Sequence, residues 1–178
     1  MSIYTKKGDK GETGLFSSDR NKKIRVLKSS QIIKTIGAID EVNSYIGVVV
    51  SQCEDNYLKE KLTAIQSDLL TIGSIIAGSS LRLNKLKVAV FEKEIDELDK
   101  ELSPLKNFIL PGGTKTASEL QFLRSLVRRA ERELVTLNDE KSLPPNVTMY
   151  LNRLSDYVYT LARYENFRNQ FVDVIWKT

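Results

Sequence analysis

Apolar residues recur at three- and four-residue steps through most of the chain after residue 30. This spacing is typical of amphipathic helices, which bury one face and expose the other. Five stretches show it, and we expect helices over about residues 30–49, 58–76, 87–102, 114–137 and 146–168. Short connections between such helices predict an all-α fold, an antiparallel five-helix bundle. The residues expected to face inward are Ile32, Ile36, Ile39, Val42, Ile46, Val49, Leu58, Leu62, Ile65, Leu69, Ile72, Ile76, Val88, Phe91, Ile95, Leu98, Leu120, Leu123, Val127, Ala130, Leu134, Leu137, Val147, Tyr150, Leu151, Leu154, Val158 and Leu161.

The fourth stretch has the clearest start. A Pro-Gly-Gly turn at residues 111–113 cannot continue a helix, and Thr114 suits the N-cap position that follows. Beside the apolar stripe of this helix runs a charged stripe, because Arg124, Arg128 and Glu131 follow one another at steps of four and three. Arg129 and Arg132 lie further round the same helix.

Two interpretations of the charged stripe remain open. Charged residues on a helix usually form a solvated face, and Glu131 can serve as one end of an intrahelical ion pair. Arginines, however, outnumber lysines on this helix, and the planar guanidinium suits phosphate or carboxylate groups. Because the stripe borders the buried one, we expect its members to be half-buried and to have partners.

Residues 1–28 are the least helical part, and we expect an irregular glycine-rich loop. Gly8, Gly11 and Gly14 are spaced three apart and alternate with lysines and threonines. Glycines let backbone amides approach an anion, and lysines and hydroxyls can complete such a site. The phosphate-loop pattern G-x-x-x-x-G-K-[ST] does not occur. A polar N-terminus without a ligand explains the same spacing equally well.

Polar residues also interrupt the first and last helical stretches. Asp40 and Glu41 fall in the middle of the first, where a carboxylate is either exposed or paired with an arginine of a facing helix. In the last, Asn152 and Asp156 share a face, with Ser155 and Arg153 beside them. Asparagine is a poor helix former, so Asn152 indicates a specific hydrogen bond, although ordinary surface polarity is the simpler interpretation.

Composition narrows the possible chemistry. The chain has 178 residues, a net charge of +4, one cysteine and no histidine. We expect a single domain over residues 1–178, in a reducing, cytoplasmic compartment and with no membrane segment. The absence of histidine removes the commonest general base and zinc ligand. Chemistry must therefore rely on carboxylates, arginines, lysines and hydroxyls, or on a reactive ligand.

The blocks YTKKGDKGETGL, GAIDEVNSYIG, FILPGGT, RSLVRRAER and YLNRLSDYVYTLAR occur in this order. Together they resemble the PduO-type ATP:cob(I)alamin adenosyltransferases, over nearly the whole chain. The resemblance implies a five-helix bundle over residues 29–170, an ATP-binding loop over residues 1–28, and a homotrimer with active sites between subunits. The implied reaction transfers the 5′-deoxyadenosyl group of ATP to cob(I)alamin and releases triphosphate, with Mg²⁺ held mainly by the ATP phosphates.

The resemblance also implies roles for individual residues. It implies catalytic roles for four residues, Arg128, Phe108, Asp40 and Arg124. Of these, Asp40 and Arg124 match a pair that forms an intersubunit salt bridge in the family. Phe108 matches the aromatic residue that closes the lower face of the corrin and excludes its dimethylbenzimidazole base. Arg153, Ser155 and Asp156 are expected on the cobalamin side. The implied ATP-binding residues are Thr5, Lys6, Lys7, Gly8, Thr13, Gly14, Lys28, Arg128, Arg129, Glu131, Arg132 and Asn152.

The chain departs from the family pattern at a few positions. Gln121 stands where many members have histidine, and Leu70-Thr71 where a Phe-Asp pair is common. A non-enzymatic trimeric module that binds nucleotide or cobalamin, as a sensor or cofactor chaperone, is the main alternative function. A helical nucleic-acid binder using residues 20–28 and 124–132 is disfavoured, because acidic residues punctuate the arginine-rich helix. A reductase and a cobalamin-dependent enzyme are the expected protein partners.

Overall fold

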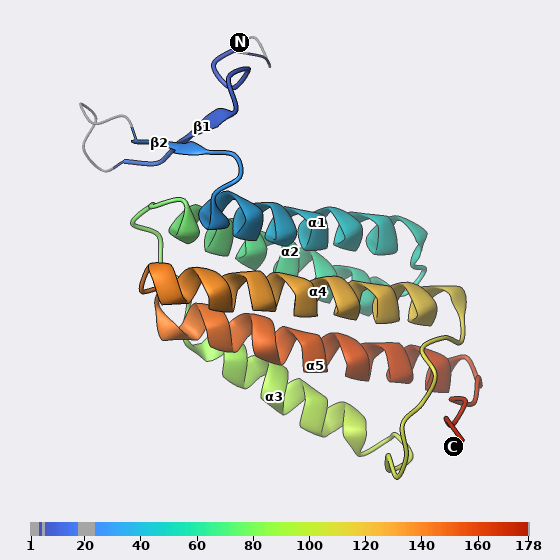
Figure 1. The fold of residues 1–178 in the computed structure, drawn as a ribbon. Coiled ribbons are helices and arrows are strands. Elements are labelled where there is room, and N and C mark those ends of the chain that lie inside the picture. Colours follow the sequence, from blue (N-terminus) through green and yellow to red (C-terminus); the bar gives the residue numbers. More distant parts are fainter. Residues whose placement is uncertain (1–3, 5, 18–23, 178) are drawn as a thin grey trace.

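The computed structural model describes residues 4, 6–17 and 24–177. It contains a two-stranded antiparallel hairpin followed by five helices (Figure 1). The elements are β1 (Glu12–Leu15), β2 (Ile24–Leu27), α1 (Gln31–Gln52), α2 (Asn56–Ile76), α3 (Leu86–Asp99), α4 (Lys115–Glu140) and α5 (Pro145–Arg168). The prediction of a five-helix bundle is confirmed. Within the expected irregular N-terminal segment the structure adds a short hairpin, in which β1 pairs with β2 from Glu12 opposite Leu27 to Leu15 opposite Ile24.

Side-chain caps fix the starts of α4 and α2. Thr114 is the N-cap of α4, as expected, and its hydroxyl accepts a hydrogen bond from the Ala117 amide at 3.1 Å. Asp55 caps α2 in the same way, through the amides of Tyr57 and Leu58. α4 continues to Glu140, beyond its last buried leucine, so its connection to α5 is shorter than the sequence indicated. α3 ends at Asp99, three residues before the expected end.

α4 is the central helix of the bundle. It packs against α1 on one side and α5 on the other, while α2 packs on α1 and α3 packs on α5 (Figure 1). The apolar stripe of α4 is fully enclosed, since Leu120, Leu123, Val127, Ala130 and Leu134 have no exposed surface. Burial of five such side chains is the main favourable contribution to holding α4 between its neighbours.

Predicted and observed cores agree along the helices, with informative exceptions. Ile32 and Ile36 are only half-buried near the start of α1, and Ile95 of α3 is half-buried because it lines a hollow described below. α5 is buried on more faces than its apolar stripe predicts, because α3 and the C-terminal tail (residues 170–177) also cover it. None of the helices in the described part of the chain has the length and apolar character required to cross a bilayer.

Two tyrosines of α5 connect the bundle to carboxylates on α2 and α3. The Tyr150 hydroxyl donates to Asp68 at 3.0 Å, and the Tyr157 hydroxyl donates to Glu94. Each carboxylate also pairs with a lysine of the opposite helix, Lys87 with Asp68 and Lys61 with Glu94. Burial raises the pKa of both tyrosines well above the ordinary value, so they remain neutral donors.

We expect Tyr150→Phe to lower the free energy of unfolding by about 2 kcal/mol, because a mostly buried carboxylate loses a donor. Urea denaturation followed by circular dichroism measures the difference. Tyr164→Phe is the matched control, because the Tyr164 hydroxyl makes no hydrogen bond to a described residue. Equal losses in the two variants would show that the Tyr150–Asp68 contact contributes nothing specific.

Candidate functional site

A hollow of about 950 Å³ lies between α3, α4, α5 and the loop before α4. We call it the α4–α5 hollow. It brings together side chains from segments that are far apart in the sequence, including most of those expected at the catalytic and cobalamin-side positions. The expected residues that line it are Phe108, Arg124, Arg128, Arg153, Ser155 and Asp156.

The arginines of α4 reach the hollow in different environments. Arg124 is half-buried, and its Nε donates to Gln121 Oε1 at 3.1 Å. Its guanidinium also lies 5.7 Å from the centre of the Tyr159 ring, a cation–π contact. Arg128, one turn further along, is exposed at the rim. The first arginine is therefore held by the protein, whereas the second is free to contact a ligand.

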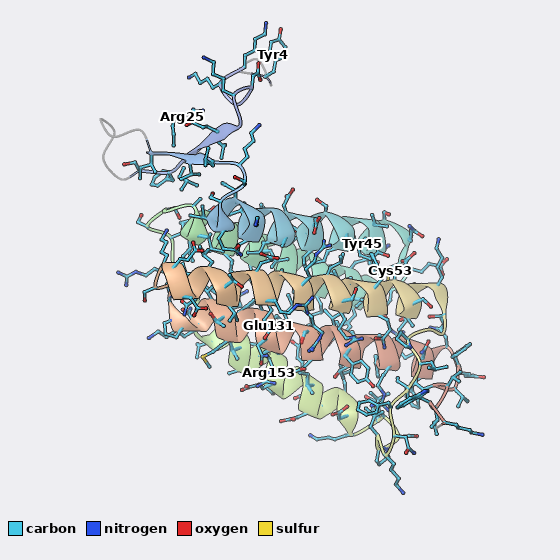
Figure 2. All side chains as sticks on the ribbon, in the orientation of Figure 1. Tyr4, Arg25, Tyr45, Cys53, Glu131 and Arg153 are labelled. Atoms are coloured by element: carbon cyan, nitrogen blue, oxygen red, sulfur yellow. The ribbon has the colours of Figure 1, made fainter. Side chains whose placement is uncertain are left out.

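α5 contributes a second set of polar groups. Arg153 Nη1 donates to Asp156 Oδ2 at 2.7 Å, and Arg153 Nε donates to Glu92 of α3 at 3.2 Å. Ser155 is buried, and its hydroxyl donates to the Asn152 carbonyl at 2.9 Å. Figure 2 places Arg153 between α5 and α3, consistent with these contacts. The wall of the hollow opposite α4 is thus charged and preorganised.

The expected nucleotide-binding residues of α4 differ in their partners, which the sequence could not decide. Glu131 accepts a hydrogen bond from Asn152 Nδ2 at 2.7 Å, which links α4 to α5 (Figure 2 labels Glu131). This bond accounts for an asparagine within a helix, and Glu131 pairs across helices rather than along its own. Arg129 forms an ion pair with Glu41 of α1. Arg132 is exposed.

Phe108 lies in the loop at the mouth of the hollow and is 79% exposed. Its ring centre is 6.4 Å from that of Trp176, in the C-terminal tail. The loop and the tail run antiparallel, because the Trp176 amide donates to the Phe108 carbonyl and the Leu110 amide donates to the Val174 carbonyl, each at 2.8 Å. Two aromatic rings therefore stand side by side at one end of the hollow.

Sequence reasoning missed Trp176 and Tyr159, which also line the hollow. The sequence pattern could have identified Tyr159, because this residue follows Ser155 and Asp156 at steps of four and three and so shares their helix face. Trp176 carried no such signal, since it lies beyond the last helix. Burial raises the pKa of Tyr159 above its ordinary value, although Arg163 and Arg124 oppose the shift. Its hydroxyl is therefore a neutral group near pH 7.

The N-terminal arm (described residues 4, 6–17 and 24–28) forms the other expected part of the site. The Lys28 amide donates to the Gly11 carbonyl at 2.8 Å, and a Cβ on Gly8 would lie 3.1 Å from the Lys28 ammonium nitrogen. Lys28 therefore lies directly over the Gly8 backbone. Thr13 and Gly14 belong to β1, Lys6 and Lys7 are exposed, and Thr5 lies outside the described residues.

Within one chain, the N-terminal arm does not reach the α4–α5 hollow. The arm extends away from the bundle beyond α1 and is fixed by the Phe16 amide, which donates to the Ala77 carbonyl at 3.0 Å (Figure 1). Asp40 is exposed on α1, and within the described part of the chain it forms no ion pair with Arg124. The expected residues of the arm and those that line the hollow therefore lie on different sides of the bundle.

The donor set of the described residues suits anions better than a protein-held metal ion. The arm supplies lysines and glycine amides, and the hollow supplies Arg124, Arg128 and Arg153. Among the described residues, no group of three or more carboxylate or thiol side chains is arranged to hold a metal ion. Such a set can neutralise a polyphosphate.

The family model described as cobalamin adenosyltransferase matches residues 3–165. A corrinoid adenosyltransferase from Bacillus subtilis (strain 168) is 40% identical over 182 residues, which cover 98% of this chain and 91% of that protein. A corrinoid adenosyltransferase from Homo sapiens is 40% identical over 174 residues, which cover 91% of this chain and 68% of that protein.

Solved structures give the same result. A variant PduO-type ATP:corrinoid adenosyltransferase from Lactobacillus reuteri, complexed with cobalamin and ATP, matches with a TM-score of 0.93 at 33% identity. The match covers 99% of this chain and 100% of that one. Another variant of that enzyme type from the same organism, complexed with ATP, matches with a TM-score of 0.90. Because the family model and the relatives span nearly the whole chain, this protein belongs to the cobalamin adenosyltransferase family.

Proposed function

We propose that this protein transfers the 5′-deoxyadenosyl group of ATP to cob(I)alamin and produces adenosylcobalamin and triphosphate. The α4–α5 hollow carries the proposal, because it unites Phe108, Arg124 and Arg128 with the polar groups of α5 in a space of about 950 Å³. The names of the relatives, which are corrinoid adenosyltransferases, support the same reaction.

The reaction does not require a general base from the protein. The cobalt of cob(I)alamin is a strong nucleophile and attacks C5′ of ATP, so that a Co–C bond forms while the C5′–O bond breaks. The electron pair of the broken bond leaves with triphosphate. The protein must align cobalt with C5′ and neutralise the charge that grows on the leaving group. A histidine-free chain with an exposed arginine at the rim of the hollow suits these tasks.

Phe108 supplies a different contribution. An axial ligand raises the energy of the cobalt orbital that must accept an electron, so four-coordinate Co(II) is easier to reduce to Co(I). An apolar ring at the lower face of the corrin denies cobalt both water and the dimethylbenzimidazole base. The exposure of Phe108, its place among the residues that line the hollow and the neighbouring ring of Trp176 support this role.

A second copy of the chain completes the site in this proposal. The arm with Lys6, Lys7, Gly8 and Lys28 extends away from its own hollow, where Arg128 is exposed. A homotrimer would let the arm of one subunit meet the Arg128 side of its neighbour, with Asp40 of one facing Arg124 of the next. ATP phosphates would then be bound from two chains, with Mg²⁺ carried on them.

In this proposal the enzyme is cytoplasmic. A reductase supplies the electrons, and the product is delivered to a cobalamin-dependent enzyme. Co(II) must be reduced on or near the protein, because a supernucleophilic Co(I) reacts rapidly in solution. The exposed, largely apolar end of the hollow around Phe108 and Trp176 is the side from which the corrinoid would be exchanged.

Product analysis tests the reaction. An anaerobic mixture of the protein, ATP, Mg²⁺ and chemically reduced cobalamin should yield adenosylcobalamin, seen by its visible spectrum and its loss on illumination. Triphosphate should appear in equal amount. Binding of both ligands without either product would identify a non-enzymatic nucleotide- and cobalamin-binding module instead.

We expect Phe108→Ala to lower kcat by about tenfold or more, because the lower face of cobalt becomes accessible to water and the base. The affinity for ATP should remain unchanged, since Phe108 lies on the corrinoid side. Steady-state kinetics started from Co(II)alamin with a reductant measure both quantities. Weak ATP binding combined with normal turnover at saturation would show that the assigned role is wrong.

We expect Arg128→Ala to lower kcat by about a hundredfold, the usual cost of removing one donor to a developing anion. Lys59→Ala, on α2 and away from the hollow, serves as the control and should retain normal turnover. The comparison uses saturating ATP and cob(I)alamin. If both variants behave alike, Arg128 does not contact the leaving group.

We expect Asp40→Asn to weaken subunit assembly or cobalamin reduction rather than ATP recognition, because it removes the charge that would face Arg124 of a neighbour. Sedimentation velocity measures assembly, and kinetics measured from Co(II) and from Co(I) separate reduction from transfer. An unchanged oligomer with unchanged kinetics would remove this role from Asp40.

A further inference from the structure

The loop before α4 and the C-terminal tail are both held by a pair of side chains on α5. Arg163 and Asn166 are one turn apart near the end of this helix, and they are only 7% and 3% exposed. Burying an arginine and an asparagine is costly unless their donors and acceptors are satisfied. The partners that satisfy them are therefore structurally important.

Arg163 joins the start of the loop to the tail. Its Nη2 donates to the Ser103 carbonyl at 2.7 Å, and its Nε donates to Asp173 Oδ2 at 3.1 Å. Asp173 is also mostly buried, with 20% of its side chain exposed. The Arg163–Asp173 ion pair thus connects α5, the loop and the tail.

Asn166 joins the end of the same loop to the same carboxylate. Its Nδ2 donates to the Gly112 carbonyl at 3.1 Å and to Asp173 Oδ1 at 2.9 Å, and its Oδ1 accepts from the Thr114 amide at 3.0 Å. Gly113, with a φ of 120°, fits against it because a Cβ there would overlap the Asn166 amide. The Pro-Gly-Gly turn is therefore shaped to receive this side chain.

Asp173 is the residue common to both halves of this cluster, which we call the Asp173 clamp (Arg163, Asn166 and Asp173). It accepts one bond from each α5 side chain, and in doing so fixes the start of the tail. The next residues of the tail then pair with the loop at Phe108 and Leu110. Both ends of the loop and its middle are held, although the Phe108 ring itself is exposed.

We propose that Asp173 is a positioning residue that, through Arg163 and Asn166, sets Phe108 and Trp176 as one aromatic wall of the α4–α5 hollow. An exposed ring has little packing of its own to fix it, so its place is decided by the backbone that carries it. The catalytic consequence rests on the proposed function, in which this wall excludes axial ligands from cobalt. The structural consequence does not depend on that function.

The single tryptophan of the chain, Trp176, reports directly on the tail. In the full-length protein without ligands, we expect Asp173→Ala to increase acrylamide quenching of Trp176 and to lower its fluorescence anisotropy. Asp173→Asn keeps the volume and one acceptor oxygen, so its effect should be intermediate, and it keeps the test valid if the alanine variant does not fold. Asp139→Ala is the control, because Asp139 is exposed at the other end of α4.

Steady-state kinetics test the catalytic consequence of the proposal. Starting from Co(II)alamin, Asp173→Ala should lower kcat by about tenfold, since displacements of an ångström in an active site cost up to about a hundredfold. The KM for ATP should change by less than about twofold, because the clamp lies on the Phe108 side. Starting from Co(I)alamin, where no axial ligand must be excluded, the loss should be smaller.

Different results would overturn the structural and the catalytic consequence of the proposal. Unchanged quenching and anisotropy in both Asp173 variants would show that the clamp does not hold the tail. A loosened tail with normal turnover from Co(II) would show that the clamp does not position Phe108 for the reaction. If the unmodified protein forms no adenosylcobalamin, the proposed function fails, whereas the fluorescence result still decides whether the clamp exists.

Discussion

The fully buried apolar stripe of α4 is the constraint on which the rest of the structure depends. Its leucines, valine and alanine are enclosed between α1 and α5, so α4 cannot rotate about its axis without exposing them. That fixed rotation decides where each arginine points. Arg124 and Arg128 reach the hollow beside α5, whereas Arg129 is turned toward Glu41 of α1. Hydrophobic packing thus directs the arginines of α4 toward different neighbours.

The site combines rigid and exposed parts in a way that suits a reaction with a highly reactive substrate. Polar groups on the walls, such as Arg153 and Arg124, are held by neighbouring side chains, which limits their reorganisation. The groups proposed to meet the ligands, Phe108 and Arg128, are exposed. A protein without histidine can work in this manner, because the substrate supplies the nucleophile and the protein supplies alignment and charge.

The N-terminal arm and the α4–α5 hollow are separate parts of the chain's surface. The N-terminal arm is attached to the bundle at Ala77, on the far side of α1 from the hollow. A single chain therefore carries exposed cationic groups in both places, Lys6, Lys7 and Lys28 in the arm and Arg128 at the hollow. The proposed homotrimer would join them across subunits, so that residues of both would act on one ligand and assembly would be part of the chemistry.

The sequence by itself determined the five helices and most of the core, because a 3.6-residue period requires no long-range information. It also singled out Arg124, Arg128, Arg153 and Phe108, which do line one hollow. It did not predict the hairpin of β1 and β2, whose short strands carry little periodic signal. The pairing of the tail with the Phe108 loop, and the enclosure of Arg163 and Asn166 around Asp173, were decided only by the tertiary structure. Such contacts join residues up to 68 positions apart, as between Phe108 and Trp176, and their energy comes from desolvated hydrogen bonds that local sequence does not encode.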